Sequence, residues 1–332
     1  MEAFYRSVNQ LISSAPRHEP APPIHTCRTS LTLTHTKDAQ PLYQRTLEAV
    51  IDPSLLPEKD LREAFKFGTC AVVSNSGRLI GSKLGKKIDA HDAVFRLNEA
   101  TVEGFEEDVG TKTTFRVVNE VVLHKKLLGR HEFLVPGVRT TAFKVIFNSP
   151  WTSLDLSRWG VADIRKGVSY QAPTMYSKWQ RTHMSNKAYL ISPMFNKHID
   201  RLLHAFINGK EKGLLKAIPS LPNSNRSSTA YIWEPSTGLS SVLLALQMCD
   251  VVDVYEIVPS SRTNLLTHYW TRSTAGSMCP HSCEAERAFL QRYSMVNDLV
   301  TIRTGVIRLS RHIHPWLEAP STIDCHESEK KD

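Results

Sequence analysis

Short apolar runs alternate with stretches of helical periodicity from about residue 68 onward, and turn residues separate them. Apolar runs of about four to eight residues rich in valine, isoleucine and phenylalanine are typical of buried strands. Strands are therefore predicted at CAVVS (70–74), AVFRLN (93–98), TTFRVVN (113–119), KVIFN (144–148) and the end of EPSTGLSSVLLALQMCDVVDVYEIV (234–258).

Other segments carry the pattern of helices. Helices are predicted at 54–67, with Ser54 as the N-cap, and at 78–92. The stretch 195–213 repeats apolar residues at helical spacing, and its apolar face consists of Ile199, Leu202, Leu203, Phe206 and Ile207. Strands that alternate with helices indicate an α/β fold with a mostly parallel, doubly wound sheet flanked by helices.

Composition changes this picture little. Hydrophobic residues make up 41% of the 332 residues, which is ample for a large core. The net charge of +8, from 41 basic and 33 acidic residues, favours an anionic ligand, although a solvated basic surface is the plainer explanation. The chain has no long basic run of the kind found in nucleic-acid tails, so no nucleic-acid partner is predicted.

The hydropathy pattern predicts no membrane helix within the chain. No apolar run approaches the roughly 18 residues that such a helix needs. The opening stretch MEAFYRSVNQLISSAP lacks the apolar region of a signal peptide. The chain is therefore expected to be soluble, or to be anchored by a segment outside it.

Polar residues that suit a phosphate or a ribose follow several of the predicted strands. The turn SNSG (74–77) comes directly after the first strand, where backbone N–H groups can face an anion, although a purely structural turn explains it as well. In PSTGLSS, Ser236 or Thr237 can cap the next helix or face a ligand. Asn98 and Asn119 end two further strands, at the edge where open α/β sheets bind ligands.

The cysteines leave several possibilities open. If the sheet brings Cys70 and Cys249 together, a bridge across so long a loop would stabilise the fold by about 5 kcal/mol on the chain-entropy model. The stretch 277–289 also offers ligands of the zinc type, together with His268. Its C-x-H-x-C spacing matches no usual zinc site, so no metal is predicted, and the candidate ligands there are Cys279, His281 and Cys283.

Taken together, these motifs resemble those of one enzyme family. The segment CAVVSNSGRLIGSKLGKKIDAHDAVFRLNEATVEGFEEDVGTKTTFRVVN resembles the large sialylmotif of the eukaryotic sialyltransferases, glycosyltransferase family 29. PSTGLSSVLLALQMCDVVDVYEI resembles the small sialylmotif, HYWT the third motif, and His281 with Glu286 the very small motif. The stretches PSTG and VYEIVPS are most similar to the β-galactoside α-2,6-sialyltransferase branch.

The resemblance implies a fold and an activity. It implies a Rossmann-like, GT-A-related catalytic domain over 66–320, a stem or lead-in segment over 1–65 and a polar tail over 321–332. Such enzymes transfer sialic acid from CMP-sialic acid, with inversion and without a metal ion, to a galactose-terminated glycan of a glycoprotein or glycolipid. Their usual place is the Golgi lumen, as type II membrane proteins, so a Golgi location is expected; no oligomeric state is predicted.

The resemblance also implies roles for single residues. By motif, His281 is the general base, and His268 with Tyr269 stabilises the departing CMP phosphate. A histidine suits the first role because its pKa near 6.5 lets it take a proton at neutral pH. Glu286 is expected to support the local fold rather than the imidazole. The residues expected to contact the donor are Asn75, Ser76, Asn98, Asn119, Ser236, Thr237, Gly238 and Tyr269.

Other expectations concern covalent features and the acceptor. The disulfide that the family forms between its large and small motifs falls on Cys70 and Cys249, and Asn225-Arg-Ser is a glycosylation sequon. The chain departs from the α-2,6 branch where acceptors bind, since Pro280 replaces a tyrosine and Val121 a glutamine. Two alternatives therefore remain: a relative that transfers another sugar from a nucleotide donor, and an inactive relative that binds nucleotide or glycan.

Overall fold

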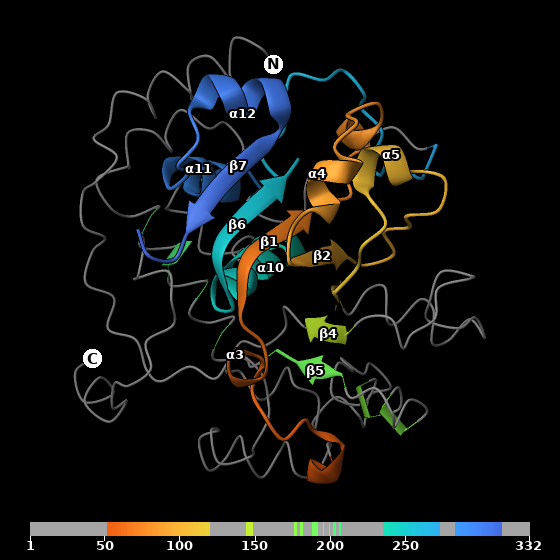
Figure 1. The fold of residues 1–332 in the computed structure, drawn as a ribbon, viewed down its shortest axis with the longest axis vertical. Helices are drawn as coiled ribbons and strands as arrows, with labels where there is room; N and C mark the ends of the chain where they lie inside the picture. Colours follow the sequence, from red (N-terminus) through yellow and green to blue (C-terminus); the bar gives the residue numbers. More distant parts are fainter. Residues whose placement is uncertain are drawn as a thin grey trace, which may run out of the picture.

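The structure is a computed structural model, and a single mostly parallel sheet organises the part of the chain that it describes (Figure 1). The described residues are 52–119, 144–148, 176–177, 180–181, 188–191, 195, 199, 202–203, 206, 235–272 and 283–313. The strands are β1 (Phe67–Val73), β2 (Ala93–Leu97), β3 (Phe115–Asn119), β4 (Lys144–Asn148), β5 (Tyr189–Leu190), β6 (Cys249–Tyr255) and β7 (Val306–Ser310). The helices and helical turns are η2 (Pro53–Leu55), α3 (Leu61–Ala64), η3 (Gly77–Leu79), α4 (Gly85–Asp89), α5 (Glu106–Val109), α10 (Thr237–Leu246), α11 (Cys283–Arg292) and α12 (Asp298–Thr304).

The strand order confirms the predicted doubly wound α/β sheet. The order is β5-β4-β3-β2-β1-β6-β7, and every neighbouring pair from β5 to β6 is parallel. Among the strands that the structure describes, only the edge strand β7 runs antiparallel, against β6. Strands β2 to β5 thus follow one another on one side of β1, and the chain then crosses back so that β6 pairs with the other side of β1. This reversal lies between β1 and β6, which is where open α/β sheets bind their ligands.

Apolar side chains cover both faces of the sheet, because successive residues of a strand point to opposite faces. In β1, Cys70 and Val72 belong to the core that contains α10, which lies behind the sheet in Figure 1. Ala71 and Val73 belong to the second core, with side chains from α4 and α5. The predicted apolar face of 195–213 is confirmed at its described positions, which are helical and buried in the α10 core: Ile199, Leu202, Leu203 and Phe206.

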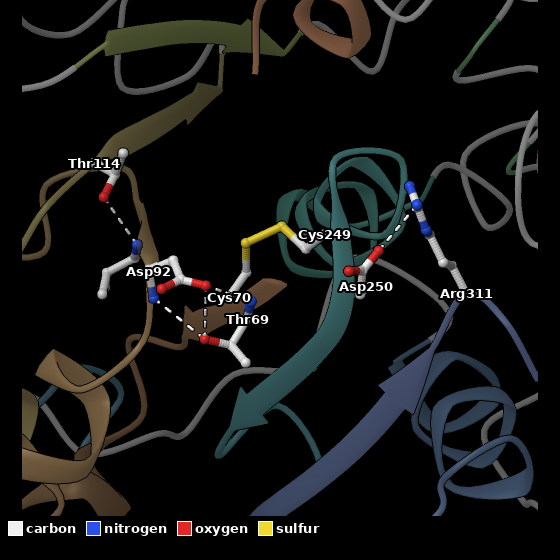
Figure 2. Close-up of a disulfide and its surroundings, with 8 residues drawn as sticks. Thr69, Cys70, Asp92, Thr114, Cys249, Asp250 and Arg311 are labelled. Atoms are coloured by element: carbon white, nitrogen blue, oxygen red, sulfur yellow. Dashed lines mark hydrogen bonds and ion pairs between the residues drawn. A yellow bond between two sulfur atoms is a disulfide. The ribbon is translucent and has the colours of Figure 1, made fainter. Parts of the chain in front are cut away.

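A disulfide joins the neighbouring strands β1 and β6, as the resemblance implied. Cys70 in β1 and Cys249 at the start of β6 are bonded across a separation of 179 residues, with their Cα atoms 6.0 Å apart (Figure 2). Both cysteines are fully buried. Cys283, the first residue of α11, is disulfide-bonded as well. The predicted sites at Asn225, Cys279 and His281 lie outside the described residues.

A buried carboxylate links β6 to the edge strand β7 and to the residue His91, which precedes β2. Asp253 in β6 is 1% exposed, and it accepts hydrogen bonds from Arg308 Nε at 2.7 Å and Nη2 at 2.8 Å. His91 Nε2 lies 3.2 Å from Oδ2, the same carboxylate oxygen that accepts from Arg308 Nη2. Burial alone would raise the pKa of Asp253, but the bonds from Arg308 and His91 outweigh burial and lower the pKa to about 2.

Two of the predicted helices are interrupted. The helix expected from Ser54 is instead the short turn η2 followed by α3, whose N-cap is Asp60. Pro57 explains the break, because proline lacks an N–H donor and disfavours helical backbone in the residue before it. The helix expected at 78–92 is split into η3 and α4, since Gly81 (φ 72°) and Lys83 (φ 56°) adopt left-handed backbone between them. No helix in the described part of the chain is long and apolar enough to cross a bilayer.

Candidate active site

The segment after β1 forms the centre of the candidate site. Ser74 N–H donates to the Tyr255 carbonyl at the end of β6, at 3.0 Å, so this segment starts beside the carboxyl end of β6. Ser76 is the N-cap of η3, and its Oγ accepts from Arg78 N–H at 3.2 Å. The Asn75 side-chain oxygen is buried and has no hydrogen-bond partner among the described residues. A buried amide oxygen without a partner is costly, so a ligand that donates to it would stabilise this turn.

A second segment, 264–270, lies directly against the first. Gly77 N–H donates to the Leu266 carbonyl at 3.1 Å, and Tyr269 N–H donates to the Asn75 carbonyl at 3.0 Å. Glycine is required at position 77, because a Cβ there would come within 2.6 Å of the Leu266 carbonyl oxygen. These contacts place His268 of the third motif next to the turn that carries Asn75.

His268 and Tyr269 have different environments. His268 is half-buried, and its imidazole stacks on the Trp270 indole with ring centroids 4.8 Å apart. Burial lowers the pKa of His268, while the negative charge of Glu99 raises it by a smaller amount. Tyr269 is 2% exposed, and its hydroxyl donates to the Thr101 carbonyl. The structure therefore leaves His268 accessible and commits the Tyr269 hydroxyl to the segment after β2.

Asn98 and Asn119 follow or end β2 and β3, and a hydrogen bond brings them together. Asn98 has left-handed backbone (φ 50°), and its side-chain oxygen accepts from Asn119 N–H at 2.9 Å. Arg116 donates to the carbonyls of Asn98 at 2.7 Å and Ala100 at 2.9 Å, which stabilises this unusual turn. Because the Asn98 oxygen is already bonded, its amide nitrogen is the end that a ligand can meet.

The N-terminus of α10 reaches the same edge of the sheet. Of the two cap candidates in the sequence, Ser236 caps the helix, because its Oγ accepts from Leu239 N–H at 3.1 Å. Glu286 of α11 is 2% exposed and accepts from Ser236 N–H at 2.7 Å and from Ser236 Oγ at 2.5 Å. Gly238 lies close to Ile257, which follows β6, since a Cβ at 238 would be 3.3 Å from the Ile257 side chain. Thr237 begins the helix and is partly exposed.

These elements together form a site suited to an anionic nucleotide. Backbone N–H groups, hydroxyls, two asparagine amides and a histidine all belong to segments at the carboxyl ends of the strands, where phosphates and riboses are bound in such folds. Among the described residues no group of three or more His, Cys, Asp or Glu side chains is arranged to hold a metal ion.

Sequence reasoning missed three charged residues beside this site. Arg78 donates to the carbonyls of Ser260 and Arg262, and Glu256 accepts from Arg262. The sequence does contain one indication of these contacts, since Glu256 comes directly after an apolar strand. A charged residue in that position needs a partner of opposite charge when it is buried.

Comparison with known proteins places the chain among characterised relatives. The model of glycosyltransferase family 29 (sialyltransferase) matches residues 24–296. The "Beta-galactoside alpha-2,6-sialyltransferase 2" of Takifugu rubripes is 30% identical over 284 residues, which are 82% of this chain and 46% of that protein. The protein of the same name from Homo sapiens is 29% identical over 263 residues, 78% of this chain and 44% of that protein. The chain thus spans about half the length of the curated relatives it matches.

Solved structures of mammalian sialyltransferases are also similar. One is a crystal structure of a mammalian sialyltransferase in complex with Gal-beta-1-3GalNAc-ortho-nitrophenol, and it is 22% identical in sequence. The alignment covers 86% of this chain and 80% of that chain, with a TM-score of 0.41.

Proposed function

Because the chain belongs to glycosyltransferase family 29, the sialyltransferases, we propose that it transfers sialic acid from CMP-sialic acid to a hydroxyl group of a galactose-terminated glycan. The observation that carries this proposal is the meeting of three motif segments at the reversal between β1 and β6. These segments are the turn after β1, the N-terminus of α10 and the segment 264–270.

The proposed mechanism uses residues of these segments together with Asn98 after β2 and His281, which the motif resemblance assigns as the general base and which lies outside the described residues. The nucleotide lies over the ends of β1, β2 and β3, where the free oxygen of Asn75 and the amide nitrogen of Asn98 suit its polar groups. His281 takes the proton of the acceptor hydroxyl, whose oxygen attacks the anomeric carbon of sialic acid. The bond from that carbon to the phosphate oxygen breaks, and CMP leaves with the electron pair. Attack from the side opposite to CMP inverts the anomeric configuration.

His268 is proposed to stabilise the departing phosphate. It lies beside Asn75, in the segment that Tyr269 N–H joins to the Asn75 carbonyl. A hydrogen bond from the imidazole to a phosphate oxygen becomes stronger as negative charge develops on CMP, which lowers the barrier. Such stabilisation supplies what a metal ion provides in other glycosyl transfers, so the proposed reaction is metal-independent.

The test is a nucleotide screen on the full chain, followed by turnover. CMP and CMP-sialic acid should raise the melting temperature, since a ligand at about 100 times its Kd adds about 2.7 kcal/mol of stability, whereas UDP and UDP-galactose should not. With a β-galactoside acceptor, mass spectrometry should detect the sialylated product.

His268→Ala should lower kcat by about 10² to 10³-fold. His312→Ala, which removes an exposed histidine at the end of β7, should leave it unchanged.

Each other outcome has a defined meaning. Stabilisation by UDP or UDP-galactose instead of CMP would contradict the proposed donor and support transfer of another sugar. Binding of CMP without turnover across a broad acceptor panel would support an inactive relative. A His268→Ala protein with full activity would remove that residue from the mechanism.

We also propose that the protein works in the Golgi lumen. The Cys70–Cys249 disulfide supports this, because such bonds persist in oxidising compartments. In secreting cells, Asn225 should then carry an N-glycan, and a glycosidase should increase the electrophoretic mobility of wild type but not of Asn225→Gln. An identical mobility for both would contradict glycosylation at this residue.

A further inference from the structure

Arg78 connects the two loops on either side of the reversal between β1 and β6. It lies in η3, three residues after Asn75, and its side chain is partly exposed. Arg78 Nη1 donates to the Ser260 carbonyl at 2.8 Å and also to the Arg262 carbonyl. These contacts span 182 and 184 residues of sequence, so they fix the turn after β1 to the loop after β6.

The acceptors of Arg78 are themselves held in place by a buried carboxylate. Glu256 follows β6, and its side chain is 0% exposed. It accepts from Arg262 Nη1 at 2.5 Å and from Ser260 N–H at 2.9 Å. Arg262 Nη1 also donates to the Thr304 carbonyl at the end of α12, at 3.1 Å. The carbonyls that Arg78 reaches therefore belong to a loop that is fixed to β6 and α12.

The chain between Arg262 and Trp270 then returns along the turn after β1. Leu266 accepts from Gly77 N–H, and Tyr269 donates to the Asn75 carbonyl. Arg78 thus holds the start of the segment whose later part carries His268. The positions of Asn75 and His268 relative to each other depend on these contacts between the two loops, in which Arg78 contributes its side chain and Gly77, Asn75, Leu266 and Tyr269 contribute backbone groups.

We propose that Arg78 is a positioning residue that holds the turn carrying Asn75 and Ser76 in register with the segment carrying His268. This inference rests on the proposed function, in which the first group binds the nucleotide and His268 meets its phosphate. Both must contact one donor molecule at once, so a fixed distance between them avoids an ordering cost on binding. Arginine suits this role, because its rigid guanidinium stays charged and presents several donors, whereas lysine offers one compact ammonium.

The experiment compares Arg78→Ala, Arg78→Lys and Arg311→Ala in the full chain. Arg311 is the matched control, because it is a partly buried arginine whose ion pair with Asp250, at 2.9 Å, lies at the opposite end of β6. Arg78→Ala should raise the Kd for CMP and the KM for CMP-sialic acid about tenfold, the scale of a lost hydrogen bond to a charged group. The KM for the acceptor should stay unchanged. Arg78→Lys should restore part of the donor affinity, and Arg311→Ala should keep the wild-type value.

A second variant tests the same register through another atom. Gly77→Ala places a methyl group 2.6 Å from the Leu266 carbonyl oxygen, so it must move the two segments apart. It should weaken CMP binding as Arg78→Ala does. Unfolding in urea, measured for all variants, separates these effects from a general loss of stability.

The outcomes separate this inference from the function on which it rests. If wild type binds CMP and Arg78→Ala binds it equally well, Arg78 has no positioning role, while the proposed function stands. If Arg311→Ala loses as much donor affinity as Arg78→Ala, the effect is one of general stability and the inference is wrong. If wild type binds no CMP, the proposed donor is wrong and the inference falls with it.

Discussion

Substitution of Glu286 by glutamine tests the contact between the very small motif and the N-terminus of α10. The change is nearly isosteric, and it replaces one carboxylate oxygen by an NH₂ group. In the wild-type protein, Ser236 donates to both carboxylate oxygens of Glu286, through its N–H at 2.7 Å and its Oγ at 2.5 Å. In Glu286→Gln, the Ser236 N–H can still donate to the remaining side-chain oxygen, but that bond is now between neutral groups. The second bond must change direction, because the new NH₂ group can only donate to Ser236 Oγ.

The magnitude follows from the two bonds. A hydrogen bond to a charged group contributes about 1.5 to 3 kcal/mol, and a neutral one about 0.5 to 1.5 kcal/mol. Because both bonds lose their charge and the Ser236 hydroxyl proton loses its acceptor, we expect the free energy of unfolding to fall by about 2 to 3 kcal/mol. The Ser236 cap on Leu239 N–H persists, so α10 should stay helical while its N-terminus becomes less firmly held.

The assay is urea unfolding of the full chain, together with the Kd for CMP. Glu284→Gln is the matched control, because Glu284 lies in the same first turn of α11 and is partly exposed. The control should lose less than about 0.5 kcal/mol, as surface substitutions do. Equal stability of Glu286→Gln and wild type would refute the reasoning, since it would mean that the buried carboxylate contributes nothing through its charge.

Three further predictions follow from contacts described above. Replacing Cys70 and Cys249 together by alanine should lower the free energy of unfolding by about 5 kcal/mol on the chain-entropy model, measured in urea against wild type with and without reductant. Tyr269→Phe should cost about 1 kcal/mol of stability and leave kcat nearly unchanged, because its hydroxyl donates to the Thr101 carbonyl; a hundredfold loss of kcat would instead place that hydroxyl on the donor. The pKa of Asp253 is lowered to about 2, so ionised Asp253 should contribute about 2 kcal/mol to the free energy of unfolding. This contribution should be complete above about pH 4 and lost as the pH falls toward 2. In urea unfolding, Asp253→Asn should therefore differ from wild type less at about pH 3 than at about pH 6.

Local patterns predicted the strands well, because a buried strand is an apolar run whose length and flanks are visible in sequence. All five predicted strands form, and Ser236 caps α10 as its position before an apolar run indicated. The parallel order also followed, since strands alternating with helices have few other arrangements. The antiparallel edge strand β7 was not predicted, although VIRLS has apolar residues on both sides of Arg308.

The errors and omissions have physical causes. The split of 78–92 comes from left-handed backbone at Lys83, which lysine rarely adopts and which no propensity scale indicates. The contacts of Arg78 join residues more than 180 positions apart, so no local pattern contains them. The residues proposed to contact the donor were named through motif resemblance, whereas the bonds that hold Asn98 and Ser236 in place became visible only in three dimensions.

The place of β6 in the sheet has a consequence for biosynthesis. β1 is an interior strand of the sheet, yet one of its two partner strands, β6, is made about 180 residues later, because Phe67 pairs with Cys249. A ribosome adds about 5 to 20 residues per second, so the growing chain carries an apolar strand with an unpaired edge for roughly ten to forty seconds. Such an edge can pair with other chains. Protection of β1 during synthesis, rather than stability of the finished fold, is therefore expected to limit the yield of this protein in foreign hosts.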